Sequence, residues 1–283
     1  MFYMWLTYLK KYGGLGPNDC VGLIVDEDTL EFINSEQPFG YICLHSQFSI
    51  EISTICKPRN VLEGMSERYN IQHYIDNFTK HELNMYMDID CLCIKNIHSL
   101  FLRFAPFDAT FFVIKEGFMV EDNYGNHLIK EEEKEFAESL PGFSAGWHAW
   151  TYTQGQLDFF NSVLKRCKEW NSPFFYTIEQ PFFNYELFLR MIKKKEKDFK
   201  ICVIENTVIA DNPLVFNSSL DTAYFANFCG NPGKDSCHYN KMLGFMYVSF
   251  LYMGHSEKRT DIVYNKINYI FNKQQEQQEP QKE

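Results

Sequence analysis

The sequence predicts an α/β protein in which helices flank a mostly parallel central sheet. Short apolar runs alternate along the chain with stretches whose apolar residues recur at helical spacing, and alternating strands and helices form sheets covered by helices. Of the 283 residues, 45% are hydrophobic and 17% are aromatic. A chain of this length and composition can bury a large core, so we expect one main domain.

The first third of the chain contributes two predicted helices and two predicted strands. Apolar residues at helical spacing predict a helix over Met1 to Lys11 and another over Pro58 to Tyr69, since proline is tolerated near a helix start. The run from Cys20 to Thr29 is apolar and then acidic, which is typical of a buried strand that ends at a polar rim. Phe39 to Leu44 is the second strand.

The same patterns continue through the remainder of the chain. Strands are predicted at Leu83 to Ile94 and Ala109 to Ile114, and helices at Gln156 to Trp170 and Pro181 to Lys195. A late strand over 200–206 and a late helix over 241–253 complete the predicted elements. No internal repeat or long linker divides the chain, so we expect a domain over residues 1–265 and a polar, flexible tail over 266–283.

Composition excludes some classes of function. The formal net charge of −10 argues against a protein that coats nucleic acid, because neutralising phosphates requires an excess of Lys and Arg. Nine cysteines without a CxxC pair indicate reduced thiols and a cytoplasmic location. No run of ~20 apolar residues predicts a membrane span, and the N-terminus lacks the pattern of a signal peptide.

Two acidic residues interrupt the apolar run between Asn84 and Ile97. Side chains two positions apart on a strand point to the same side, so we expect Asp88 and Asp90 to share a face. Carboxylates this close repel unless a cation or proton lies between them, and oxygen ligands select Mg²⁺ or Mn²⁺. The alternative is that one aspartate caps the next turn while the other pairs with a lysine such as Lys95.

The segment "MYMDIDCLCIKNIHSLF" resembles the metal-binding DxD segment of GT-A glycosyltransferases, most closely the retaining, glycogenin-like and galactosyltransferase-like group. Upstream, "KPRNVLEGMSERY" resembles the basic-headed helix before that strand. Downstream, "GFSAGWHAW", "EQPFFNYEL" and "NFCGNPGKDSCHYNKM" resemble the family's N-A-G, D-Q and H-x-x-G-x-x-K segments. The similar segments follow the family's order over about residues 57 to 245.

The resemblance implies a Rossmann-like GT-A domain that transfers a hexose or pentose from a nucleotide-diphosphate sugar, expected to be a UDP-sugar. The acceptor would be a carbohydrate or glycoprotein, the configuration would be retained, and Mn²⁺ or Mg²⁺ would assist the departing diphosphate. It implies that Asp88, Asp90, Glu179 and Gln180 are catalytic, and that Asp88, Asp90 and either Asn227 or His238 bind the metal. The donor-binding residues that it implies are Lys57, Arg59, Ser144, Ala145, Gly146, Gly230, Gly233, Lys234 and Lys241.

The chain departs from the family pattern at two of these segments. Ser144 stands where the family has Asn, and Asn227 stands where it has His. A second DxD, at Asp26 and Asp28, competes for the metal but lacks the downstream phrase.

Other interpretations of the sequence stay open. Trp147, His148 and Trp150 are either core residues or a stacking platform for an acceptor sugar. The alternative functions are a haloacid-dehalogenase-like phosphatase with an aspartate nucleophile, although Leu92 stands where Thr or Val is expected, and a noncatalytic carbohydrate-binding protein.

Overall fold

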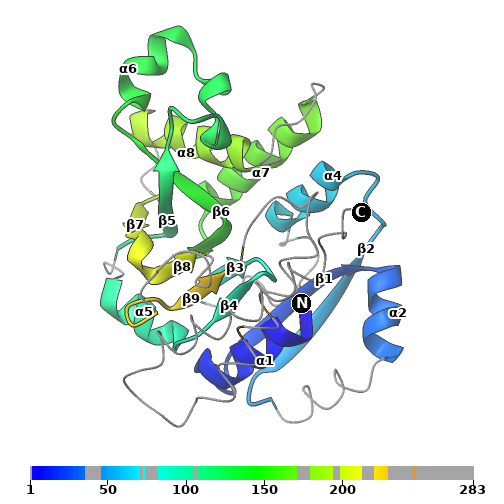
Figure 1. Ribbon diagram of the computed structural model, residues 1–283. Coiled ribbons are helices and arrows are strands. Elements are labelled where there is room, and N and C mark those ends of the chain that lie inside the picture. The colour runs from blue at the N-terminus through cyan, green and yellow to red at the C-terminus, as the bar shows by residue number, and fades with distance from the viewer. Residues whose placement is uncertain are drawn as a thin grey trace, which may run out of the picture. The chain divides into compact units, whose positions relative to one another are not determined.

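The computed structural model (Figure 1) describes residues 2–35, 46–70, 73, 82–104, 108–170, 179–193, 198–211, 220–228, 242 and 245. The chain divides into two compact units, each assembled from separate segments. The larger unit comprises 15–88 and 99–206, and the smaller comprises 1–14, 89–98 and 207–283. The predicted tail lies outside the described residues, so the division at residue 265 stays a prediction.

A four-stranded sheet forms the centre of the larger unit. Its strand order is β3 (Asn84–Met87), β6 (Pro141–Trp150), β5 (Phe111–Phe118) and β7 (Ile201–Ile204). β5 pairs with β7 in parallel, whereas β6 pairs with β3 and β5 in antiparallel fashion. The α/β class is therefore confirmed, while the described strands form a mixed sheet and not the mostly parallel one that we predicted.

The pairing between β5 and β6 is interrupted near the middle of β6. Val113 lies opposite His148, but two residues later Lys115 lies opposite Phe143. Two steps along β5 thus correspond to five along β6, and residues 144–147 of β6 have no partner on β5 in this register. Such a bulge leaves backbone groups that must bond elsewhere.

Helices pack against the four-stranded sheet and bury its aromatic residues. α7 (Gln154–Glu169) and α8 (Gln180–Lys193) lie side by side (Figure 1), and α4 (Val61–Ser66) with the 3₁₀ turn η1 (Glu67–Tyr69) packs on α7. Helix α7 begins after Thr153, whose side chain caps it by accepting from the backbone N–H of Gln156. The core includes Tyr69, Phe111, Trp150, Phe160 and Phe183.

Two further groups of elements belong to the larger unit. β1 (Cys20–Asp26) and β2 (Ser49–Ile55) form a parallel pair, and α2 (Glu27–Ser35) follows β1 directly. Between β5 and β6 lie the short turns η4 (Asp122–Tyr124), η5 (Asn126–Leu128) and η6 (Glu131–Glu133), and α6 (Lys134–Ala137). These turns form a second small core with α8, centred on Met119, Tyr124 and Phe188.

The smaller unit contains a three-stranded sheet of order β4 (Cys91–Cys93), β9 (Phe225–Asn227) and β8 (Ile209–Asp211). β4 runs antiparallel to β9, and β8 runs parallel to it. Helix α1 (Phe2–Tyr12) packs on β4. The 3₁₀ turn η7 (Asn206–Val208) precedes β8, and α5 (Ile97–Phe104) begins in this unit and ends in the other.

Most predicted elements lie where expected, with instructive differences. The predicted strand over Leu83 to Ile94 is two strands, because a turn at Ile89 and Asp90 separates β3 from β4. The prediction that Asp88 and Asp90 share a face of one strand is therefore wrong. Strands β2, β6, β8 and β9 were not predicted. The predicted strand at 39–44 and most of the helix at 241–253 lie outside the described residues.

The acidic end of the first apolar run has a different role from the predicted polar rim. Glu27 and Asp28 form the first turn of α2, where negative side chains are favoured by the partial positive charge of a helix N-terminus. In the part of the chain that the structure describes, no helix is both long enough and apolar enough to cross a membrane.

Candidate functional site

A buried arginine, Arg68, lies at the centre of the polar site in the larger unit. Its Nη2 is 3.2 Å from Asp88 Oδ1, and its Nη1 is 3.2 Å from Glu179 Oε1. The guanidinium carbon lies 4.5 Å from the centre of the Tyr86 ring. Burial alone would lower the pKa of Arg68, but the charges of Asp88 and Glu179 raise it above its ordinary value, so the side chain stays cationic.

The two carboxylate oxygens of Asp88 have different surroundings. Oδ1 accepts a hydrogen bond from the Tyr86 hydroxyl and forms the ion pair with Arg68. Oδ2 makes no hydrogen bond to any residue that the structure describes, and a Cβ atom built on Gly146 would stand only 2.6 Å from it. Asp88 is therefore held through Oδ1, while Oδ2 lies over Gly146. The side chain as a whole is 30% exposed.

Glu179 precedes α8 and is buried against Arg68. Burial raises the pKa of Glu179, the charge of Arg68 partly opposes this, and the charge of Asp88 adds to it. The site thus combines a partly exposed carboxylate, Asp88, with a buried carboxyl group, Glu179, that holds a proton more readily than usual. Groups with displaced pKa values are common where acid–base chemistry or charged ligands are handled.

Strand β6 carries the segment that resembles N-A-G and connects these groups. The carbonyl of Ala145 accepts from Arg68 Nη1 at 3.0 Å, and the carbonyl of Gly146 accepts from the backbone N–H of Asp88 at 2.9 Å. Gln180 Oε1 accepts from the N–H of Ala145 at 3.0 Å. The structure therefore brings Asp88, Glu179, Gln180 and the segment 144–146 together, as expected from the sequence.

The aromatic residues of β6 are core residues. Trp147, His148 and Trp150 are buried, so the interpretation as a stacking platform for an acceptor sugar is wrong. Burial, together with the charge of Arg68, lowers the pKa of His148 to about 3. The imidazole is therefore neutral at physiological pH.

The smaller unit contains the other predicted metal ligands that the structure describes. Asp90 lies in the turn before β4, and its carbonyl accepts from the N–H of Phe228 at 3.0 Å. Asn227 lies on β9 opposite Cys91, and its Nδ2 donates to Asp211 Oδ1 at 2.8 Å. Burial raises the pKa of Asp211, and the hydrogen bond from Asn227 partly offsets this. The sequence analysis did not single out Asp211.

The predicted metal ligands can be compared with the ligand atoms that divalent metals prefer. Asp88 Oδ2, the carboxylate of Asp90 and the amide oxygen of Asn227 are all oxygen donors, which suit Mg²⁺ and Mn²⁺. Within the described residues, however, no group of three or more His, Cys, Asp or Glu side chains is gathered for a metal. The residue types by themselves are compatible with such an ion.

The remaining predicted donor-binding residues are either on the surface or outside the described part of the chain. Lys57 and Arg59 are exposed and pair with Asp28 at 2.5 Å and Glu63 at 2.9 Å. The second DxD is used locally, since Asp26 accepts from the N–H of Thr29. The residues that lie outside the described part are Gly230, Gly233, Lys234, His238 and Lys241.

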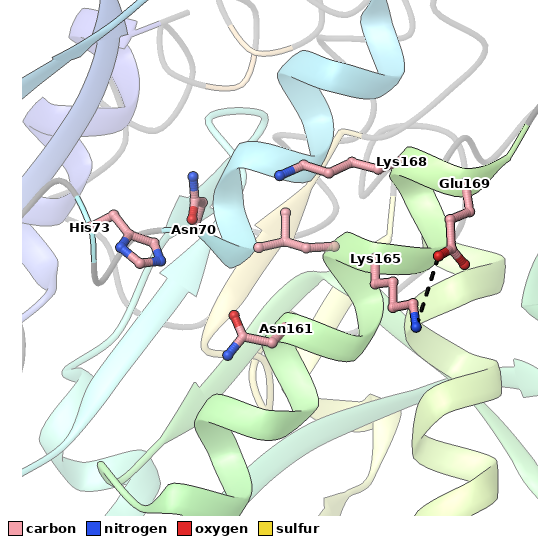
Figure 2. Close-up of a pocket in the computed structure, with 7 residues that line it drawn as sticks. Asn70, His73, Asn161, Lys165, Lys168 and Glu169 are labelled. Carbon is pink, nitrogen blue, oxygen red and sulfur yellow. Dashed lines mark ion pairs between the residues drawn. The ribbon is translucent and has the colours of Figure 1, made fainter.

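A pocket of about 390 Å³ lies elsewhere in the larger unit, beside helix α7 (Figure 2). Asn70 and His73 line one side of it, and the α7 residues Asn161, Lys165 and Lys168 line the other. No residue of the Arg68 site lines this pocket, so the two are separate features. Lys165 and Glu169 face each other as an ion pair at 3.9 Å.

Sequence reasoning missed Arg68, although a signal was present. Two acidic residues next to an apolar strand require a cation, and Arg68 is the second-to-last residue of the segment that resembles the basic-headed helix before this strand. The alternative partner Lys95 is wrong, because its ammonium donates to the carbonyl of Asp221.

Comparisons with solved structures find matches that include the following three. A glycosyltransferase involved in the glycosylation of the major capsid of PBCV-1 is 14% identical, with a TM-score of 0.45, over 80% of this chain and 98% of that one. The WbbM bifunctional glycosyltransferase is 11% identical, with a TM-score of 0.45, over 77% of this chain and 47% of that one. Mouse xyloside xylosyltransferase 1 is 12% identical, with a TM-score of 0.48, over 82% and 92%.

No protein-family model matches the sequence, and no curated protein matches it either. With identities of 11–14% and TM-scores below 0.5, activity has to be argued from the residues of the site.

Proposed function

We propose that this protein is a metal-dependent glycosyltransferase that moves a sugar from a nucleotide-diphosphate donor to a carbohydrate or glycoprotein acceptor. The observation that carries the proposal is Asp88, whose Oδ1 is fixed by Arg68 and Tyr86 while Oδ2 is presented over Gly146. The order of the sequence segments that resemble the GT-A family supports it, as does the convergence of Glu179 and the 144–146 segment on Asp88.

Arg68 forms ion pairs with Asp88 and with the buried carboxyl group of Glu179. A carboxylate fixed in this way is suited to a cation that accompanies a diphosphate, since it needs no rearrangement when the cation binds. One residue separates Asp88 from Asp90, so their Cα atoms lie within about 7 Å of each other. We infer that Asp88 and Asp90 hold Mn²⁺ or Mg²⁺, with Asn227 or His238 as the third ligand.

When bound, the metal would stabilise the negative charge that develops on the departing diphosphate. The protein's own residues would orient the donor. Ser144 offers a hydroxyl, while Glu179 accepts or donates a hydrogen bond according to its protonation. A UDP-sugar donor and retention of configuration are the parts of the proposal that rest on the sequence resemblance alone.

The experiment is a thermal-shift titration with UDP in the presence of Mn²⁺, followed by a screen of nucleotide sugars for Mn²⁺-dependent hydrolysis. Binding to the native state at 100 times Kd stabilises it by about 2.7 kcal/mol, which raises the melting temperature measurably. The Asp88→Asn variant keeps an acceptor for Tyr86 and Arg68 but replaces one carboxylate oxygen by an amide nitrogen. It should lose the Mn²⁺-dependent shift while it remains folded.

A matched pair of glycine variants tests the role of Oδ2. Gly146→Ala places a methyl group against Asp88 Oδ2 and should weaken UDP binding in Mn²⁺ at least tenfold. In Gly16→Ala, the nearest atom to the new methyl group is 3.9 Å away, so this variant should bind like the wild type. If neither UDP nor GDP raises the melting temperature, the proposal is refuted and a noncatalytic binding protein is favoured. If the protein releases phosphate from an aryl phosphate, the proposal is refuted and a phosphatase is favoured.

A further inference from the structure

We propose that Gln180 and Asn184 are positioning residues of this site. They hold strand β6 within and next to the stretch that β5 does not pair with, and they act on the reaction only through the backbone of residues 143–146. The inference deepens the proposed function and rests on it. It also gives Gln180 a different role from the catalytic one that the sequence resemblance implies.

The starting point is the interrupted pairing of β6. Between Phe143 and His148 the register to β5 jumps, so the intervening residues have no partner on that strand. Phe143, Ser144 and Ala145 are nevertheless buried. Buried backbone groups without partners are costly, so side chains must supply the missing hydrogen bonds.

Asn184 bonds both backbone groups of Phe143, the residue opposite Lys115 where the pairing with β5 resumes. Its Oδ1 accepts from the N–H of Phe143 at 2.7 Å, and its Nδ2 donates to the carbonyl of Phe143 at 2.8 Å. The same Nδ2 also donates to the carbonyl of Gln180 at 3.0 Å, one turn back on α8. One fully buried side-chain amide thus bonds to a strand residue as a neighbouring strand would, and it ties that residue to the first turn of α8.

Gln180 supplies the next bond along the strand. Its Oε1 accepts from the N–H of Ala145 at 3.0 Å, and its Nε2 donates to the carbonyl of Asn123 at 3.4 Å. Both polar atoms of the amide are therefore bonded to backbone. Gln180 and Asn184 are four residues apart on α8, so they lie on the same face of the helix and meet alternate residues of β6.

The held segment contacts the reactive groups directly. The carbonyl of Ala145 accepts from Arg68, which pairs with both Asp88 and Glu179. The carbonyl of Gly146 accepts from the N–H of Asp88, and the Gly146 α-carbon lies beneath Asp88 Oδ2. A shift of β6 by about 1 Å would move both contacts, and misplacements of this size reduce catalysis strongly.

The test uses Gln180→Met and Asn184→Leu, which keep apolar bulk but remove the hydrogen-bonding groups. The matched control is Gln154→Met, because the Gln154 amide is exposed and donates to the carboxylate of Asp158 at 2.8 Å. Two quantities are measured under conditions in which all variants are folded. The first is amide hydrogen exchange without ligand, and the second is the affinity for UDP in Mn²⁺.

The proposal makes a distinct prediction for each variant. Exchange at the Ala145 amide should accelerate at least tenfold in Gln180→Met, and exchange at the Phe143 amide should do so in Asn184→Leu. Both variants should bind UDP in Mn²⁺ about tenfold more weakly, although Asn184 is fully buried and cannot touch a ligand. Gln154→Met should change neither quantity.

Two results would overturn the proposal. If Gln180→Met weakens UDP binding with unchanged exchange at Ala145, and Asn184→Leu binds UDP like the wild type, then Gln180 acts directly on the donor. If exchange accelerates but UDP affinity is unchanged, the two amides only stabilise the fold. A wild-type protein that binds no UDP would refute the proposed function instead, while the exchange data would still decide whether these amides hold β6.

Discussion

Replacing Arg68 by methionine gives the strongest test of the charge arrangement at this site. The substitution removes the guanidinium between Asp88 and Glu179 and leaves an apolar side chain of similar length. Asp88 is 30% exposed and can be solvated, whereas Glu179 is buried and would lose its only ion pair among the residues described. The cost therefore arises mainly from the buried carboxylate of Glu179.

The magnitude follows from the cost of leaving a buried charge without its partner, about 3–5 kcal/mol. For a protein of this size, that corresponds to a fall in melting temperature of about 10 °C. A second substitution, Glu179→Gln, removes the carboxylate that Arg68→Met leaves unpaired. The double variant should therefore recover more than half of the lost free energy of unfolding.

The dependence on pH has a defined sign. The pKa of Glu179 is already raised by burial, and it should rise further without Arg68. A carboxyl group whose pKa is raised in the folded state stabilises the fold most below its unfolded pKa, about 4.3, and this contribution is lost as the pH rises through the folded value. The Arg68→Met variant should therefore be less destabilised at pH 5 than at pH 7.

Urea unfolding of the wild type, both single variants and the double variant at these two pH values measures all three effects. Two results would show that Arg68 does not compensate Glu179 in the folded protein. One is a loss below 1 kcal/mol in Arg68→Met, and the other is a double variant no more stable than Arg68→Met.

Three further substitutions test individual contacts. The pKa of His148 is about 3 in the folded protein, so His148 contributes stability above pH 6.5 that is lost at about 1.4 kcal/mol per pH unit as the pH falls towards 3. In His148→Phe, the free energy of unfolding should therefore fall less steeply as the pH decreases. A wild-type-minus-variant difference that is constant between pH 7 and 4 would contradict this. Tyr86→Phe removes the hydroxyl that donates to Asp88 and should cost about 1.5–3 kcal/mol by urea unfolding; a neutral effect would mean that this bond is replaced by water. Thr153→Ala removes the cap that accepts from Gln156 and should cost about 1 kcal/mol without changing UDP affinity, whereas reduced affinity would connect the start of α7 to the site.

The sequence determined the class of the fold and the position of most elements. Apolar spacing is a local property, so helix α7 and strand β5 were predicted close to their observed bounds. It also placed Asp88 next to an apolar strand and indicated that a cation was required there. The sequence drew attention to residues 144–146 and to Glu179, and the structure brings both to Asp88.

The strand pairings and the partners of the buried charges were decided by the tertiary structure. Arg68 bonds to Ala145, which lies 77 residues later, and Phe143 bonds to Asn184, 41 residues later. Periodicity carries no signal for such pairings, because they depend on how β6 meets β5 and α8. The turn at Ile89 and Asp90 is a further example: two acids one residue apart looked like one face of a strand, but β3 ends at Met87 and the turn separates it from β4.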